Sequence, residues 1–157
     1  YEAGGTYQVS DLNYRAMKPN DPNNIQKLSE GHKPAFVLTD PARFANGTVD
    51  VTVDETVTTL PYAQLAMSTS LAMENLYVKD VYTTTNEDSS SYGAMTLICE
   101  VNGIKIDVRT VVLIDENGEM ITESAYLGKT IDVKGIVDCF NGSYQIKVLD
   151  DNYINVH

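Results

Sequence analysis

The chain has 157 residues, and its 22 acidic and 11 basic side chains give a net charge of −11. This length suits one full domain plus a smaller unit, and no apolar run approaches the length that crosses a bilayer. The acidic excess disfavours a protein that coats phosphate backbones, because long-range attraction would act in the wrong direction. With two cysteines, two histidines and no Cys-x-x-Cys pair, the composition gives no support for a zinc site.

The first 70 residues give mixed signals. Pro19–Asn24 is rich in turn residues and predicts a break in regular structure. Pro34–Thr39 and Thr48–Thr59 are expected to be extended, the second because its valines alternate with polar residues. We interpret residues 1–70 as an N-terminal extension or small partial domain of mixed or β structure, with residues 60–73 as the best linker candidate.

From Leu71 onward, strand patterns follow one another at short intervals. Leu76–Thr85 is predicted as the first strand, with Leu76, Val78 and Tyr82 sharing its inner face. The polar stretch Asn86–Ser91 is predicted as a loop.

A hairpin is predicted next, formed by Ala94–Val101 and Ile104–Thr110 around an Asn-Gly turn. Its inward face is entirely apolar, so the two strands are expected to line a core. Val111–Ile114 is interpreted as a continuation of the second of these strands. Met120–Leu127 has room for one helical turn before the next strand.

The segment from Gly128 to Val148, GKTIDVKGIVDCFNGSYQIKV, predicts two further strands. Apolar residues alternate on both sides of Asn141-Gly142, which supplies the positive φ angles of a tight hairpin.

This segment resembles the last two strands of OB-fold modules found in secreted bacterial nucleases and bacterial lipoproteins. In those modules Gly-Lys-Thr, Val-x-Gly-x-Val and Asn-Gly-x-Tyr-Gln-Ile recur in this order. The resemblance implies a mostly β chain with a five-stranded, OB-fold-like Greek-key barrel over residues 71–157. It also implies an exported bacterial protein, extracellular or in the cell envelope. Because the chain begins at Tyr1 without methionine, we expect a mature form or a fragment whose export signal or lipid anchor is not part of it.

Two features depart from this family pattern. The connector before Gly128 is too short for a long helix, so the usual barrel-closing helix is not expected. Cys139 stands where the family pattern favours an aromatic residue. Cys139 and Cys99 both fall on apolar strand phases, which fits two buried free thiols at least as well as a disulfide.

OB-folds commonly bind ligands on the outward face of the second and third strands and on the adjoining loops. Here that face is predicted to carry charged residues of both signs and no aromatic side chain. Aromatic residues are expected instead at one mouth of the barrel. The candidate ligand-binding residues are Tyr92, Ile98, Lys105, Arg109, Lys134 and Phe140.

No catalytic or metal site is predicted, and no cofactor. Serine-rich Asn86–Ser91 lacks a glycine elbow and a histidine partner. Asp115, Asn117 and Glu119 alternate as at the start of a calcium loop, but the bidentate glutamate at the far end is missing, so we favour a turn.

The sequence therefore predicts a non-catalytic binding or accessory module that mediates contacts with a protein partner or with copies of itself. One alternative, implied by the family resemblance, is binding of single-stranded nucleic acid, which the charge and the missing stacking residues disfavour. A second alternative is an oligosaccharide-binding module.

Overall fold

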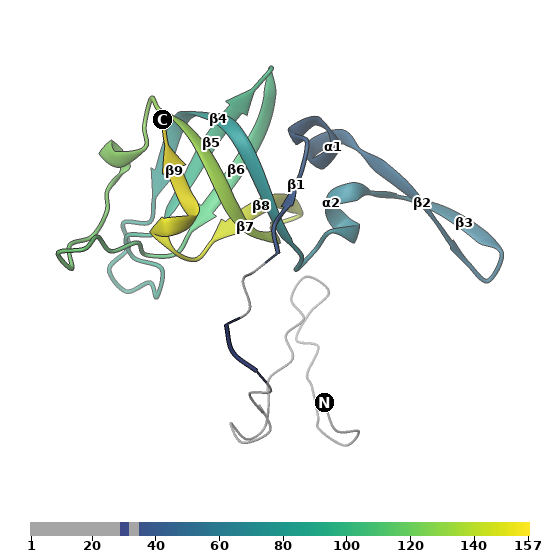
Figure 1. The fold of residues 1–157 in the computed structure, drawn as a ribbon, viewed down its shortest axis with the longest axis horizontal. Coiled ribbons are helices and arrows are strands. Elements are labelled where there is room, and N and C mark those ends of the chain that lie inside the picture. The colour runs from purple at the N-terminus through teal and green to yellow at the C-terminus, as the bar shows by residue number, and fades with distance from the viewer. Residues whose placement is uncertain (1–28, 32–34) are drawn as a thin grey trace. The chain divides into compact units, whose positions relative to one another are not determined.

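The computed structural model describes residues 29–31 and 35–157, and the chain divides into two compact units, residues 1–34 and 35–157. The predicted break at Pro19–Asn24 lies outside the described residues. The second unit is built mainly of strands (Figure 1). It includes the elements between residues 37 and 65 together with the barrel.

Five strands close into a barrel, which confirms the predicted OB-fold-like architecture. They are β4 (Ser70–Thr83), β5 (Met95–Val101), β6 (Ile104–Thr110), β7 (Thr130–Phe140) and β8 (Ser143–Val148). Their order is β4-β5-β6-β8-β7, and β7 pairs back onto β4 to complete the closure. Only β6 and β8 run parallel, while the other neighbours in the barrel are antiparallel. This is the strand order and direction of an OB-fold.

Strand β4 pairs with β7 along one edge and with β5 along the other, and each of these pairings contains one register shift. One lies between Met73 and Leu76 against β7, and the other lies between Val78 and Asp80 against β5. Such bulges bend a strand and increase its twist, which lets one long strand serve both sides of a small barrel.

The second bulge corrects the predicted position of Tyr82. Leu76 and Val78 are fully buried as expected, but the extra residue reverses the alternation beyond it. Val81 therefore packs against the core, and Tyr82 is 61% exposed on the outer face. The placement of Tyr82 on the inner face was wrong because strict period-two alternation does not allow for a bulge.

The two predicted Asn-Gly turns are confirmed. Asn102 and Gly103 have φ angles of 50° and 77°, and Asn141 and Gly142 have φ angles of 49° and 79°. Both turns join antiparallel neighbours, β5 to β6 and β7 to β8.

The core is formed by the inward residues of the five strands, with contributions from two other segments. Phe44 from helix α1 (Pro41–Asn46) and Tyr126 from the connector before β7 are both buried in it. The Tyr126 hydroxyl donates a hydrogen bond to Asp151 Oδ1 at 2.6 Å, and burial raises the pKa of Tyr126. The connector holds one 3-10 turn, η2 (Glu123–Ala125), in agreement with the expected single helical turn.

Two expectations about connecting segments were wrong. Residues 60–73 are not a linker, because they contain helix α2 (Tyr62–Leu65) and the buried start of β4. Residues 111–114 do not extend β6, which ends at Thr110, although Ile114 forms an isolated bridge with Met120.

Short strands and a 3-10 turn flank the barrel. Strand β1 (Val37–Leu38) runs parallel beside β4, and β9 (Ile154–Val156) runs antiparallel beside β7. The turn η3 (Asp151–Tyr153) precedes β9. The rings of Phe36 and Tyr153 lie 5.3 Å apart and join the segment before β1 to this turn.

Strands β2 (Thr48–Val53) and β3 (Thr56–Pro61) form a separate antiparallel hairpin between α1 and α2. The extended segment predicted at 48–59 therefore reverses direction at Asp54 and Glu55, whose φ angles are 47° and 65°. Neither residue is glycine, so the turn gave no clear signal in the sequence. Among the described residues, no helix is long and apolar enough to cross a membrane.

Candidate ligand-binding groove

A groove with a volume of about 690 Å³ crosses the outer face of the barrel. Its floor comes from the outward residues of the barrel strands, and the loop between β4 and β5 contributes to its wall. The side chains that line it and bear on ligand binding are Tyr82, Thr84, Ser89, Ser90, Ser91, Thr96, Arg109, Asp138, Phe140, Gln145 and Lys147.

The strand register explains why side chains from distant parts of the chain meet in this groove. Tyr82 pairs with Thr96, Thr96 with Arg109, and Arg109 with Lys147. These four residues form one row across β4, β5, β6 and β8. Since neighbouring strands lie about 4.8 Å apart, the row spans roughly 14 Å along the curved barrel surface.

Arg109 lies inside this row, between Thr96 and Lys147, and is held by three hydrogen bonds. Its Nη1 donates to Thr96 Oγ1 at 3.1 Å and to the Ala94 carbonyl at 3.5 Å, and its Nη2 donates to Thr84 Oγ1 at 3.1 Å. The guanidinium group therefore connects both ends of the β4–β5 loop. It forms no ion pair with any residue in the described part of the chain, so its positive charge is available to a ligand.

Lys147 adds a second positive charge next to Arg109. It too lacks an ion-pair partner within residues 29–31 and 35–157. Asp138 is the one acidic residue in the described lining, and its Oδ2 accepts a hydrogen bond from Gln145 Nε2 at 3.1 Å. The groove thus has a small positive balance on a protein whose net charge is −11.

Two aromatic rings line the groove and remain largely open to solvent. Tyr82 is 61% exposed and Phe140 is 65% exposed. Exposed rings in the same groove as Arg109 and Lys147 provide flat apolar surfaces on which planar or ring-shaped ligand groups can stack.

The β4–β5 loop is closed at its base by backbone hydrogen bonds. Thr84 N donates to the Ala94 carbonyl at 2.9 Å, and Gly93 N donates to the Thr84 carbonyl at 2.8 Å. Gly93 also lies tightly against Met120, since a Cβ atom added to Gly93 would come within 2.3 Å of the Met120 Sδ atom. These contacts hold the serine-containing wall of the groove in place.

The structure brings two of the six predicted site residues into the groove, namely Arg109 and Phe140. Ile98 lies half-buried on the same outer face, in the next row, where it pairs with Asp107 and Asp80.

The other three predicted site residues lie outside the groove lining. Lys105 forms an ion pair with Asp107, with Nζ and Oδ2 3.1 Å apart. Tyr92 is 41% exposed within the β4–β5 loop, and Lys134 is exposed on β7, opposite Ala72 of β4.

Sequence reasoning missed Tyr82, Gln145 and Lys147. Gln145 and Lys147 alternate along the strand with the inward residues Tyr144, Ile146 and Val148. The sequence pattern therefore already placed both on the outer face. For Tyr82, the consecutive polar residues Lys79 and Asp80 were the available sign of a bulge, because they interrupt the alternation.

The calcium-like stretch forms a compact turn. Asp115 Oδ1 accepts hydrogen bonds from Asn117 N at 2.9 Å and Glu119 N at 2.8 Å. The bond from Glu119 N is the main cause of the lowered pKa of Asp115. No group of three potential metal ligands is found among the described residues, and Cys99 and Cys139 are both free thiols.

No protein-family model matches this chain, and neither does any curated protein sequence. Any functional assignment therefore rests on the chemistry of the residues that line the groove.

Proposed function

We propose that this chain is a non-catalytic binding module whose groove binds a short stretch of single-stranded nucleic acid. The observation that carries this proposal is the presence of two exposed rings, Tyr82 and Phe140, in the same groove as Arg109 and Lys147. Stacked bases and neutralised phosphates are the two contacts that such ligands require. The sequence predicted no aromatic residue on this outer face. The bulge in β4 turns Tyr82 outward, so that its ring lies there.

The size and charge of the groove limit what it can hold. A row of roughly 14 Å fits only a few nucleotides, at the lower end of the range of about 4 to 16 that one OB-fold accommodates. Two cations neutralise about two phosphates, so the logarithm of the binding constant should fall with the logarithm of salt concentration with a slope of about −1.4. Binding is therefore expected to be modest and sensitive to salt.

The direct test is a fluorescence anisotropy titration with a labelled twelve-residue oligothymidine at low ionic strength. Lys147→Glu should weaken binding about tenfold and make the salt slope about 0.7 less steep, because one phosphate contact is lost. Lys105→Glu is the matched control, since it makes the same charge change on β6 outside the groove.

The aromatic residues are tested separately. Tyr82→Ala and Phe140→Ala should each weaken binding by about 1 to 3 kcal/mol if each ring stacks on one base. Both side chains are exposed, so little loss of stability is expected. No binding at low salt, or an equal loss in Lys147→Glu and Lys105→Glu, would contradict the proposal.

Oligosaccharide binding would give a different result in the same experiments. A neutral sugar stacked on Tyr82 and Phe140 would lose affinity in the alanine variants, but its binding would not depend on salt. Retention of a neutral oligosaccharide with no retention of the oligonucleotide would assign the groove to carbohydrate.

A further inference from the structure

The hairpin of β2 and β3 leads away from the barrel, as Figure 1 shows. Its base is fixed: Tyr62 N donates a hydrogen bond to the Gly47 carbonyl at 2.8 Å, and the Arg43 guanidinium lies 4.4 Å from the centre of the Tyr62 ring. Phe44 and Ala63, from the helices on either side, are buried in the core. The hairpin is thus a projecting element on an anchored base.

Strand β3 is an open edge of unusual composition. Each strand of the hairpin has only the other as a neighbour among the described residues. Edge strands are normally protected by charged residues, proline or bulges. Strand β3 contains no charged residue, its one proline is its last residue, Pro61, and Val57 is 61% exposed. A two-stranded ribbon is also only marginally stable by itself, so it would gain from a third strand.

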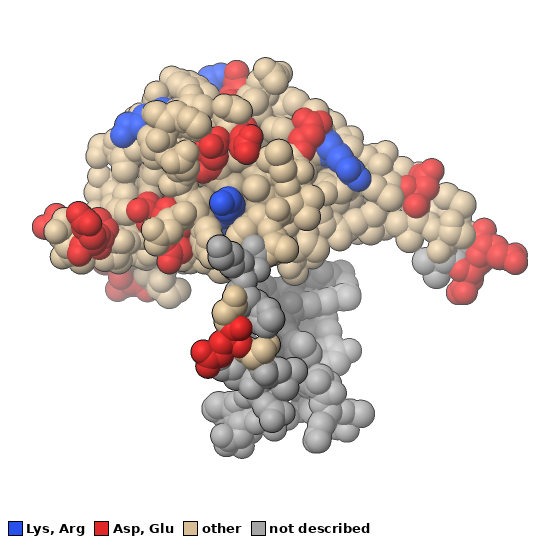
Figure 2. Space-filling view, viewed as in Figure 1, with Lys and Arg blue, Asp and Glu red and all other residues tan. Residues whose placement is uncertain are grey.

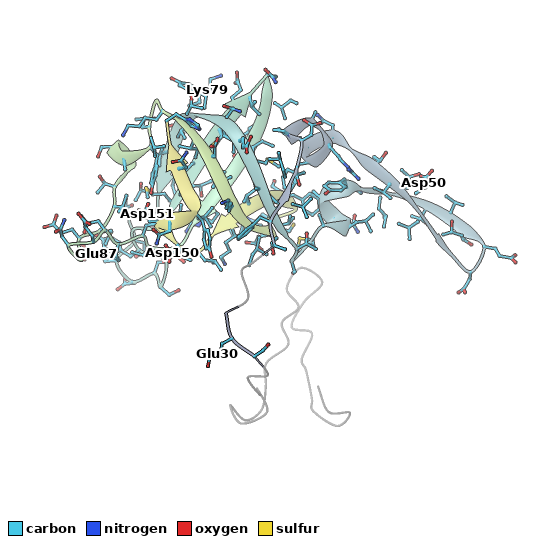
Figure 3. The ribbon with its side chains drawn as sticks, viewed as in Figure 1. Glu30, Asp50, Lys79, Glu87, Asp150 and Asp151 are labelled. Carbon is cyan, nitrogen blue, oxygen red and sulfur yellow. The ribbon has the colours of Figure 1, made fainter. Side chains whose placement is uncertain are left out.

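The charge of the hairpin indicates what kind of strand would pair with this edge. Residues 48–61 include Asp50, Asp54 and Glu55 and no lysine, arginine or histidine. Figure 2 shows acidic groups midway along the hairpin and at its end, and Figure 3 labels Asp50 midway along it. A second copy of this chain would bring the same acidic ribbon and another net charge of −11, so self-pairing is disfavoured.

We propose that the open edge of β3 is a docking site for an extended segment of a partner protein that carries lysine or arginine residues. The segment adds a third strand to the hairpin by backbone pairing, the mode known as β-augmentation. Its basic side chains lie nearest the acidic residues of the turn, Asp54 and Glu55, whereas Asp50 on β2 lies one strand further away and accepts a hydrogen bond from Thr59 at 2.6 Å. This site is separate from the groove and does not depend on the ligand of the groove.

The test uses a labelled ten-residue peptide in which lysine and valine alternate, titrated against the full chain at low ionic strength. The control peptide has the same sequence with alternate backbone amides methylated, which removes the donors needed for strand pairing and keeps the charge. We expect the methylated peptide to bind at least tenfold more weakly. Hydrogen exchange should slow at those alternate amides of residues 56–60 that point away from β2 when the unmodified peptide is bound.

Matched variants test the role of charge. Asp54→Asn with Glu55→Gln should weaken peptide binding about three- to tenfold, whereas Glu116→Gln with Glu119→Gln should not, although both pairs remove two exposed charges from a turn. The proposal is overturned by equal binding of the two peptides, by protection located outside the hairpin, or by sedimentation that shows a dimer paired through β3.

Discussion

At the scale of single residues, Arg109 has a structural role and, in the proposed function, also a binding role. Its hydrogen bonds to Thr84, Ala94 and Thr96 hold the β4–β5 loop, and its charge faces the groove. A guanidinium group suits this position because its five N–H donors serve the protein and a ligand at the same time. The Lys147 side chain makes no hydrogen bond or ion pair within residues 29–31 and 35–157, which makes Lys147 the cleaner site for a binding variant.

The two cysteines are expected to differ in reactivity. Burial raises the pKa of the Cys99 thiol to about 12, with a further contribution from the nearby Asp107 carboxylate. Such a thiol carries almost no thiolate at pH 8, whereas Cys139 is only half-buried. Titration of the native protein with dithionitrobenzoate should therefore detect one thiol, and titration in guanidinium chloride should detect two. Cys139→Ser should remove the native reaction, and a fast native reaction in that variant would contradict the burial of Cys99.

Asp132 links the first bulge of β4 to the residue after β9. Its Oδ1 accepts a hydrogen bond from Asn75 N at 2.9 Å and lies 2.9 Å from His157 Nε2. Partial burial by itself would raise the pKa of Asp132, but the hydrogen bonds from Asn75, His157 and Asn155, together with the charge of His157, outweigh it and lower that pKa.

This shift predicts a pH dependence of stability. Because the folded pKa is lowered, Asp132 stabilises the fold above its unfolded pKa of about 3.9, and this stabilisation is lost as the pH falls through the folded pKa. Asp132→Asn should reduce the free energy of unfolding by about 1 kcal/mol at pH 6, and the difference from the original chain should shrink at pH 3. Urea denaturation at both pH values measures this, with Asp88→Asn in the exposed loop as control. A difference that stays constant with pH would exclude the carboxylate as its source.

At the scale of elements, the sequence predicted those strands whose turns and alternation are regular. Both Asn-Gly hairpins formed as expected, because this dipeptide readily adopts the positive φ angles of a tight turn. The β2–β3 turn was missed because Asp54 and Glu55 adopt the same conformation without glycine. The outward position of Tyr82 was missed because a bulge depends on the pairing of β4 with β5, which a pattern along one strand does not record.

Gly135, in the middle of the Val-x-Gly-x-Val motif, allows β7 and β8 to approach closely. A Cβ atom at this position would lie 2.6 Å from the Lys147 carbonyl oxygen and 2.7 Å from Ile146 Cγ2. Gly135→Ala should therefore push the two strands apart and lower the free energy of unfolding by about 1 to 3 kcal/mol. Lys134→Ala, at the exposed neighbouring position, is the control in the same urea denaturation experiment. Equal stability of the two variants would show that the strands can separate here without cost.

At the scale of the whole molecule, the net charge and the charge of the groove have opposite signs. The Debye length is about 8 Å at physiological ionic strength, so distant acidic residues are largely screened from a ligand in the groove. If the groove binds nucleic acid as proposed, the acidic surface removes long-range steering and slows association, while short-range contacts with Arg109 and Lys147 remain. The amino-acid composition gives only the net charge of the whole chain. The fold of the barrel shows that Arg109 and Lys147 line the same groove as Tyr82 and Phe140.

The most direct test of the proposed function is a nuclear magnetic resonance titration of the ¹⁵N-labelled chain with a short oligothymidine at low salt. We expect the largest shifts at the amides of Tyr82, Thr96, Arg109, Gln145 and Lys147, which come from four strands and share one groove. The amides of residues 48–61 in the projecting hairpin should not move. Shifts confined to other surfaces, or no shifts at millimolar oligonucleotide, would contradict nucleic-acid binding in this groove.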